Sequence, residues 1–140
     1  MKRLAVLSFP LLLALTAPAF SADDSLFQDL GGQPGIDKFV DASVDNYLAD
    51  PRIKDIFSDS NMDRIRAEFK VQFCEISGGP CKYAGHDMTA AHKGLHLTNA
   101  DFNAVVEDLQ AAMESCNIPF ATQNRFLARL APMQHQVVTR

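Results

Sequence analysis

The sequence predicts an all-α domain, and three observations carry that prediction. Apolar residues recur at intervals of three and four in four long stretches, as they do along one face of an amphipathic helix. Each stretch is bounded by residues that start or stop helices, such as Gly31-Gly32, Asp50-Pro51 and Gly78-Gly79-Pro80. No run alternates polar and apolar side chains for long enough to indicate a strand.

The first residues of the chain indicate a secretory signal peptide over residues 1–21, which leaves residues 22–140 as one domain. A short basic start precedes an apolar run over Leu4–Leu15, and small residues follow at the expected cleavage site. The run is too short to span a membrane. Cleavage there leaves a chain of about 119 residues, the size of one domain. We therefore expect an exported protein, periplasmic or secreted, with no membrane span.

The composition argues against a nucleic-acid partner, because the formal net charge is −4 and no basic patch is written in the sequence. The cysteines are Cys74, Cys81 and Cys116, an odd number that leaves at least one thiol unpaired. Cys74 and Cys81 flank a glycine-rich turn that can bring their Cα atoms within the roughly 7 Å that a disulfide tolerates. In an exported protein we expect this bridge, and two free thiols are the alternative.

A short helical turn opens the domain, and the first long helix follows it. Ser25–Gln28 has the pattern of a capping box, and the glycines at 31 and 32 end that turn. Pro34 suits a first helical turn, and we expect a helix over Pro34–Ala49. Its apolar positions are Ile36, Phe39, Val40, Val44, Tyr47 and Leu48.

The second long helix is expected over Asn61–Ser77. A short apolar cluster, Ile53, Ile56 and Phe57, precedes it, and Asn61 is a suitable N-cap. The apolar face of this helix carries Met62, Ile65, Phe69, Phe73 and Ile76. The glycine pair that follows ends it.

Two further helices complete the domain. Thr98 and Asp101 form a capping box for a helix over Ala100–Cys116. The apolar positions of that helix are Phe102, Val105, Val106, Leu109 and Met113. A turn at Asn117–Pro119 leads to the last helix, Thr122–Met133, which we expect to bend or end near Pro132.

The stretch Tyr83–Thr98, YAGHDMTAAHKGLHLT, lies between the second and third long helices. At helical spacing, Met88 and Leu95 share a face with His92, so the imidazole lies in an apolar row. A buried imidazole needs a hydrogen-bond partner or a metal. It could be a core histidine bonded to a carbonyl, or an axial ligand of haem iron. This stretch alone leaves both interpretations open.

Read in order, the chain resembles the group I truncated haemoglobins. The motifs that carry the resemblance are LFQDLGGQPGI at 26–36, YLADPRIKDIF at 47–57, NMDRIRAEF at 61–69, GGPCKYAGHDM at 78–88, AHKGL at 91–95 and LTNADFNAVVEDL at 97–109. Together they cover nearly all of the chain after the signal peptide. The resemblance implies a two-over-two helical sandwich, the truncated globin fold, in which the first two long helices cross the last two.

The resemblance also implies a cofactor and a ligand. The cofactor is haem b (iron protoporphyrin IX), with His92 as the proximal iron ligand, and the ligand is a diatomic gas such as O2, NO or CO. Phe57 falls on the phenylalanine that packs against the haem in globins. The residues expected to contact the cofactor are His92, Phe57, Val44, Ile65, Phe69, Tyr83, His86, Met88 and Phe102.

The distal wall departs from the family pattern. Val44 stands at the position of the usual tyrosine, and Ile65 and Phe69 stand at the positions that carry glutamine, so none of them can donate a hydrogen bond. Tyr47 lies one helical turn beyond Val44, and helical geometry is expected to point it elsewhere. The sequence therefore predicts an apolar distal pocket from which O2 leaves quickly.

Charged and polar residues near the expected site have two interpretations each. His86 falls where the family often has an arginine near a haem propionate, and Arg64 and Arg66 are further candidates; each could instead be a solvated surface residue. Glu68 replaces the usual lysine and is expected to repel a propionate.

Two other histidines are candidates for chemistry. His96 is spaced to share a zinc ion with His92, but no third ligand is near in the sequence. His135 falls close to a tail histidine that bonds covalently to a haem vinyl group in some relatives. A solvent-exposed position is the alternative for both.

The function expected from the resemblance is gas binding, in preference to catalysis. The alternatives are a nitric-oxide-detoxifying or peroxidase-like haem enzyme, with a redox partner, and a haem carrier or sensor module. The absence of a distal acid–base residue argues against peroxide cleavage.

Overall fold

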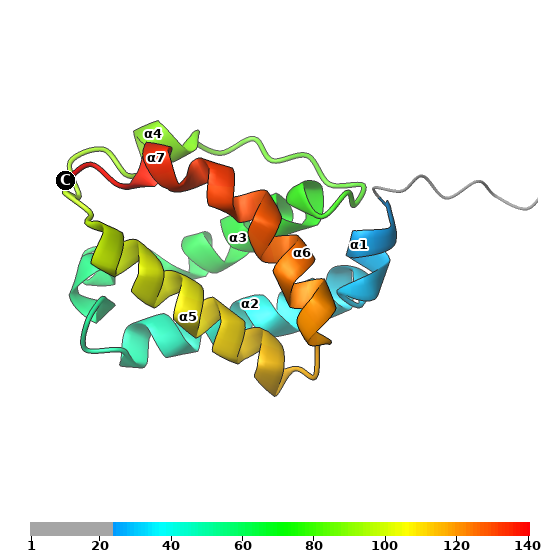
Figure 1. Cartoon of the computed structure of the whole chain (residues 1–140). Helices are drawn as coiled ribbons and strands as arrows, with labels where there is room; N and C mark the ends of the chain where they lie inside the picture. Colours follow the sequence, from blue (N-terminus) through cyan, green and yellow to red (C-terminus); the bar gives the residue numbers. More distant parts are fainter. Residues whose placement is uncertain (1–23) are drawn as a thin grey trace, which may run out of the picture.

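Helices account for the regular secondary structure of residues 24–140, which are the residues that the computed structural model describes (Figure 1). The signal peptide predicted over residues 1–21 lies outside them. The helices follow in the order α1 (Asp24–Asp29), α2 (Gly32–Ala49), the 3-10 helix η1 (Lys54–Phe57), α3 (Met62–Ile76), α4 (Met88–Ala91), α5 (Asn99–Ser115), α6 (Phe120–Leu130), the 3-10 helix η2 (Ala131–Met133) and α7 (Gln134–Val137). Within residues 24–140 no helix combines the length and apolar character needed to cross a membrane.

Two pairs of long helices cross each other. Helix α2 packs against both α3 and α5, while α6 packs against α5 and α1. In Figure 1, α5 and α6 pass in front of α2 and α3. This arrangement is the all-α, two-over-two sandwich that the sequence predicts.

The helix boundaries follow the capping residues named from the sequence. The Asn61 side chain accepts a hydrogen bond from Arg64 N, and Thr98 and Asp101 form the complete capping box expected at the start of α5. At the first turn the prediction is wrong, because α1 already begins at Asp24 and Ser25 lies inside it. The last helix ends earlier than expected, at Leu130, because Pro132 follows within the tighter turn η2.

The core is centred on aromatic rings from α2, α3 and α6. The centroid of the Phe73 ring lies 6.0 Å from that of Phe39 and 5.0 Å from that of Phe126. Phe39 and Phe126 themselves meet edge to face at 5.7 Å. Edge-to-face aromatic pairs contribute beyond the area that they bury. We refer to Phe39, Phe73 and Phe126 as the aromatic core.

The predicted disulfide is present and closes the turn after α3. Cys74 Sγ and Cys81 Sγ are 2.05 Å apart, and their Cα atoms are 5.7 Å apart. Gly79 lies within this turn, where an added Cβ would be only 2.7 Å from Cys74 Sγ and 2.6 Å from the Phe27 ring. A side chain at residue 79 would therefore force the turn open. Cys116, at the C-cap of α5, is the free thiol.

Candidate functional site

A cavity of about 410 Å3 opens beside α3, α5 and the residues around His92. Its volume is in the range of pockets that hold small molecules and cofactors. The lining is mainly apolar and comes from several separate stretches of the chain between Tyr47 and Val137. We call residues 88–97, which form one wall, the His92 segment.

Nearly all of the residues that the sequence predicts as cofactor contacts line this single cavity. They are Phe57, Ile65, Phe69, Tyr83, His86, Met88, His92 and Phe102. Val44 is the exception, because it is fully buried within the core cluster and does not line the cavity. The expectation that Val44 forms the cavity wall is therefore corrected.

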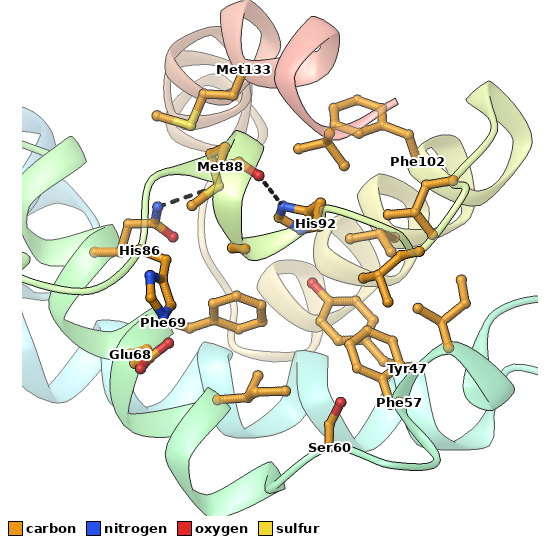
Figure 2. Close-up of a pocket in the computed structure, with 18 of the residues that line it drawn as sticks. Tyr47, Phe57, Ser60, Glu68, Phe69, His86, Met88, His92, Phe102 and Met133 are labelled. Atoms are coloured by element: carbon orange, nitrogen blue, oxygen red, sulfur yellow. Dashed lines mark hydrogen bonds between the residues drawn. The ribbon is translucent and has the colours of Figure 1, made fainter. Parts of the chain in front are cut away.

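Tyr47 lines the cavity instead, contrary to the expectation that it points elsewhere. Its ring stacks on Phe57 with the centroids 5.7 Å apart and an interplanar angle of 8°. Figure 2 shows the two rings together below His92, with the Tyr47 hydroxyl turned toward the cavity. Burial raises the pKa of this phenol well above its usual range, and a hydrogen bond with Ser43 only partly opposes that shift. The hydroxyl therefore keeps its proton at neutral pH.

His92 is held by a hydrogen bond from its own helical turn. Nδ1 lies 2.7 Å from the carbonyl oxygen of Met88. A carbonyl can only accept, so Nδ1 carries the proton and the Nε2 lone pair is left available. Both interpretations of His92 share this geometry, since a bond to a carbonyl leaves one ring nitrogen free to bind a metal.

The His92 segment begins with the short helix α4, and His92 is the C-cap of that helix. The Asp87 side chain accepts a hydrogen bond from Ala90 N at 2.7 Å and caps α4. Gly94, with φ of 82°, turns the chain two residues after His92. Met88, His92 and Leu95, which are expected on one face, all line the cavity, and Ala91 lines it too.

One edge of the cavity is polar. Arg64 and Glu68 form an ion pair of 2.8 Å on α3, and the Tyr83 hydroxyl donates to the carbonyl of His86 at 3.0 Å. Figure 2 shows the His86 ring beside the Glu68 carboxylate. Partial burial and then the charge of Glu68 raise the pKa of Tyr83. This edge carries both signs of charge together with neutral donors.

Three of the other candidates lie away from the cavity lining. Arg66 is paired with Asp41 and Asp45 on α2. His96 and His135 are exposed. Within residues 24–140, no cluster of three or more side chains suited to hold a metal ion includes His96, so nothing in the geometry favours the zinc interpretation.

Sequence reasoning missed two parts of the cavity wall. Gln72 is an amide on α3, and Met133 and Val137 come from the C-terminal turns. Helix α7 packs against α4, and Figure 1 shows the two side by side. The amide hydrogens of Thr139 and Arg140 both bond to the carbonyl of Leu97, at 3.0 and 3.1 Å. The only signal in the sequence for this part of the wall was a helical pattern near Met133. Such a pattern does not indicate which other segment the helix packs against.

Known proteins with the same fold have similar sequences. The family described as bacterial-like globin matches residues 25–139. A group 1 truncated haemoglobin of Synechocystis is 38% identical over 99 residues, which cover 68% of this chain and 80% of that protein. One from Tetrahymena thermophila is 33% identical over 94 residues, with 67% of this chain and 78% of that protein covered.

Solved structures agree with this assignment. The Fe(III) form of truncated haemoglobin from Tetrahymena pyriformis superposes with a TM-score of 0.80 at 28% identity, covering 82% of this chain and 98% of that one. A 2/2 haemoglobin from a Synechococcus species, with covalently attached haem, gives 0.76 at 26% identity over 82% and 98%. The chain therefore belongs to the bacterial-like globins, and among them to the group 1 truncated haemoglobins, a family of haem-binding globins.

Proposed function

We propose that this protein holds haem b in the cavity, with His92 Nε2 bound to the iron, and that a diatomic gas binds on the opposite face. The observation that carries the proposal is the 2.7 Å hydrogen bond between His92 Nδ1 and the Met88 carbonyl. Such a bond fixes the tautomer of a metal-binding histidine, orients its ring and raises its basicity. His92 lies in the cavity wall, so its remaining nitrogen is available to a group bound there.

The other lining residues fit the same cofactor. A porphyrin presents two apolar faces and one edge with carboxylates, and the cavity has mainly apolar walls and one polar edge. At that edge, Arg64 and His86 are the groups suited to bind carboxylates. The negative charge of Glu68 disfavours a carboxylate at this edge, and Glu68 already forms an ion pair with Arg64. When bound, the haem supplies an iron atom with one open coordination position for a gas.

The gas-binding side combines an apolar wall with the hydroxyl of Tyr47. Phe57, Ile65 and Phe69 contribute hydrocarbon, and Tyr47 contributes a protonated hydroxyl. A donor near polar bound O2 strengthens binding, whereas CO gains much less. We therefore propose that Tyr47 donates a hydrogen bond to bound O2. O2 should then leave more slowly than the sequence predicts for a pocket without a donor.

We also propose that the protein acts after export, in the periplasm or outside the cell. The Cys74–Cys81 disulfide supports this location, because such bonds persist in oxidising compartments. Gas binding is preferred over peroxidase-like or nitric-oxide-detoxifying catalysis. Two acids line the cavity, and both are already engaged: Glu68 in an ion pair with Arg64, and Asp101 in the capping box with Thr98.

The proximal role of His92 can be tested with His92→Gly and added imidazole. We expect the variant to lose stable haem binding and to recover it when free imidazole fills the space of the side chain. Absorption spectra of the ferric, ferrous and CO-bound forms report the change. His96→Gly is the matched control and should keep the wild-type spectra. A normal histidine-ligated spectrum in His92→Gly without imidazole would contradict the assignment.

The role of Tyr47 can be tested with Tyr47→Phe, which removes only the hydroxyl. We expect O2 release to become about tenfold faster, equivalent to roughly 1.4 kcal/mol. CO release should change far less, and stopped-flow kinetics measure both rates. If both gases leave Tyr47→Phe at wild-type rates, the hydroxyl does not reach the bound ligand.

A further inference from the structure

Gln72 is a buried polar side chain in the wall of the cavity, next to aromatic residues. It lies on α3 between Phe69 and Phe73 in the sequence, lines the cavity and is 8% exposed. Its amide nitrogen donates to Met88 Sδ across 3.6 Å. An amide buried without a partner costs free energy, so its hydrogen-bond partner decides whether it is tolerated there.

Met88 accepts two hydrogen bonds, one from Gln72 and one from His92. Its sulfur accepts from Gln72, and its backbone carbonyl accepts from His92 Nδ1 at 2.7 Å. Figure 2 marks both hydrogen bonds as dashed lines meeting at Met88. Two hydrogen bonds in series therefore connect α3, on one side of the cavity, with the imidazole on the other.

The turn that carries Met88 needs such support. Helix α4 covers only Met88–Ala91, and an isolated helical turn of this length does not persist in water. Its residues are half-buried or exposed, so the core does not hold them. Helix α7 packs on α4, and the Gln72 contact adds a link to this turn from the long helix α3.

We propose that Gln72 is a positioning residue for the iron ligand. By holding the Met88 side chain it fixes the carbonyl that orients His92, and so it sets the direction of Nε2. This inference rests on the proposed function, because it assumes that His92 binds haem iron. An N–H···S bond is weak, so the expected effects are modest.

The test is a double-mutant cycle of Gln72→Leu and Met88→Leu. The first change removes the donor and the second removes the sulfur, while both keep an apolar side chain of similar length. Coupled residues deviate from additivity, and residues that act independently do not. We expect Gln72→Leu to speed haem transfer to apomyoglobin by about two- to fivefold, equivalent to roughly 0.4–1 kcal/mol. In the Met88→Leu background, the same change should have no further effect.

Two spectroscopic readouts separate positioning from general stability. In ferrous protein, the iron–histidine stretching frequency should shift in Gln72→Leu and stay unchanged when Gln72→Leu is added to Met88→Leu. In protein without haem, nitrogen NMR of the His92 ring should show the Nδ1–H tautomer in wild type and a mixture in Gln72→Leu. Gln110→Leu is the matched control, since Gln110 is a half-buried glutamine of α5 outside the cavity lining.

Other outcomes are decisive as well. Equal effects of Gln72→Leu in both backgrounds would overturn the proposal. An effect that disappears with haem dimethyl ester would also overturn it, because the amide would then serve the porphyrin carboxylates. If Gln72→Leu does not fold, Gln72→Glu serves instead, since an ionised carboxylate of the same length cannot donate. A wild-type protein without an iron–histidine signature would refute the proposed function itself, and that result is distinct from a failed cycle.

Discussion

The aromatic core and the His92 segment are built in opposite ways. In the core, Phe39 and Phe126 are fully buried, and rings from three helices contact one another. In the His92 segment, Leu95 is 46% exposed and α4 is a single turn. The core is held by its own side chains. The segment is held by contacts from elsewhere in the chain.

This difference indicates that folding and cofactor binding are separable. The core contains the large buried apolar area that stabilises a domain of this size. The segment is fixed by the contacts of Met88, by α7 and by the loop that follows Cys81. We therefore expect changes in the core to alter unfolding, and changes around the segment to alter haem retention.

Phe126→Ala should lower the free energy of unfolding by about 3–5 kcal/mol, because it leaves a cavity between Phe39 and Phe73. Urea unfolding of the haem-free protein measures the loss. Leu95→Ala is the matched control in the segment and should cost less than about 1 kcal/mol, since Leu95 is half exposed. Comparable losses in the two variants would show that the regions are not distinct.

Replacing both Cys74 and Cys81 by Ala should lower the unfolding free energy by roughly 2–3 kcal/mol, because the closed loop restricts the unfolded chain. The change should also speed hydrogen exchange in residues 82–91, which the bridge connects to α3. Cys116→Ala is the control and should leave exchange there unchanged. A titration that finds three thiols in the unreduced, unfolded wild type would show that the bridge does not form.

Deletion of residues 134–140 should separate the two regions most clearly. It removes the packing of α7 on α4 and the hydrogen bonds to the Leu97 carbonyl. We expect roughly fivefold faster haem loss, equivalent to about 1 kcal/mol, with a smaller reduction in the free energy of unfolding. Haem transfer to apomyoglobin measures the first quantity. Unchanged haem loss would mean that the segment does not depend on the C-terminal turns.

The cap of α5 lies where the segment meets the core, and it should show the smallest effect. Thr98→Val should cost about 0.5–1 kcal/mol of unfolding free energy.

The backbone amide and then the hydroxyl of Thr98 lower the pKa of Asp101. A carboxyl with a lowered folded-state pKa stabilises the fold above its unfolded pKa of about 3.9, and that contribution is lost as the pH falls through the folded value. The difference between wild type and Asp101→Asn should therefore shrink below about pH 4. A difference that persists at lower pH would exclude the ionised carboxylate as its source.

Local signals in the sequence were enough to predict most of the fold. Asn61 and Thr98 start their helices as expected, and the spacing of Met88 and His92 puts both in one cavity wall. The assignment of faces on α2 failed. Val44 and Tyr47 are both fully buried, because α2 lies between α3 and α5. Helical periodicity identifies an apolar face, but it does not divide that face between the core and a cavity.

The contributions of Gln72 and Val137 to the cavity could not be predicted for another reason. Each depends on which distant segment packs over the His92 segment, and a single sequence does not contain that information. Gln72 had no helical pattern that distinguished it from a surface amide. Its burial follows from the approach of α4 to α3.

The packing of α7 on α4 also bears on the order in which the protein is made. Residues 134–140 leave the ribosome after every other part of the cavity wall, yet they close over a segment synthesised some forty residues earlier. A nascent chain can thus assemble its aromatic core only once α6 has emerged, and the wall around His92 is completed later still. Cofactor capture should accordingly be a late, post-translational event, and a ribosome stalled within α6 should display a chain unable to retain haem.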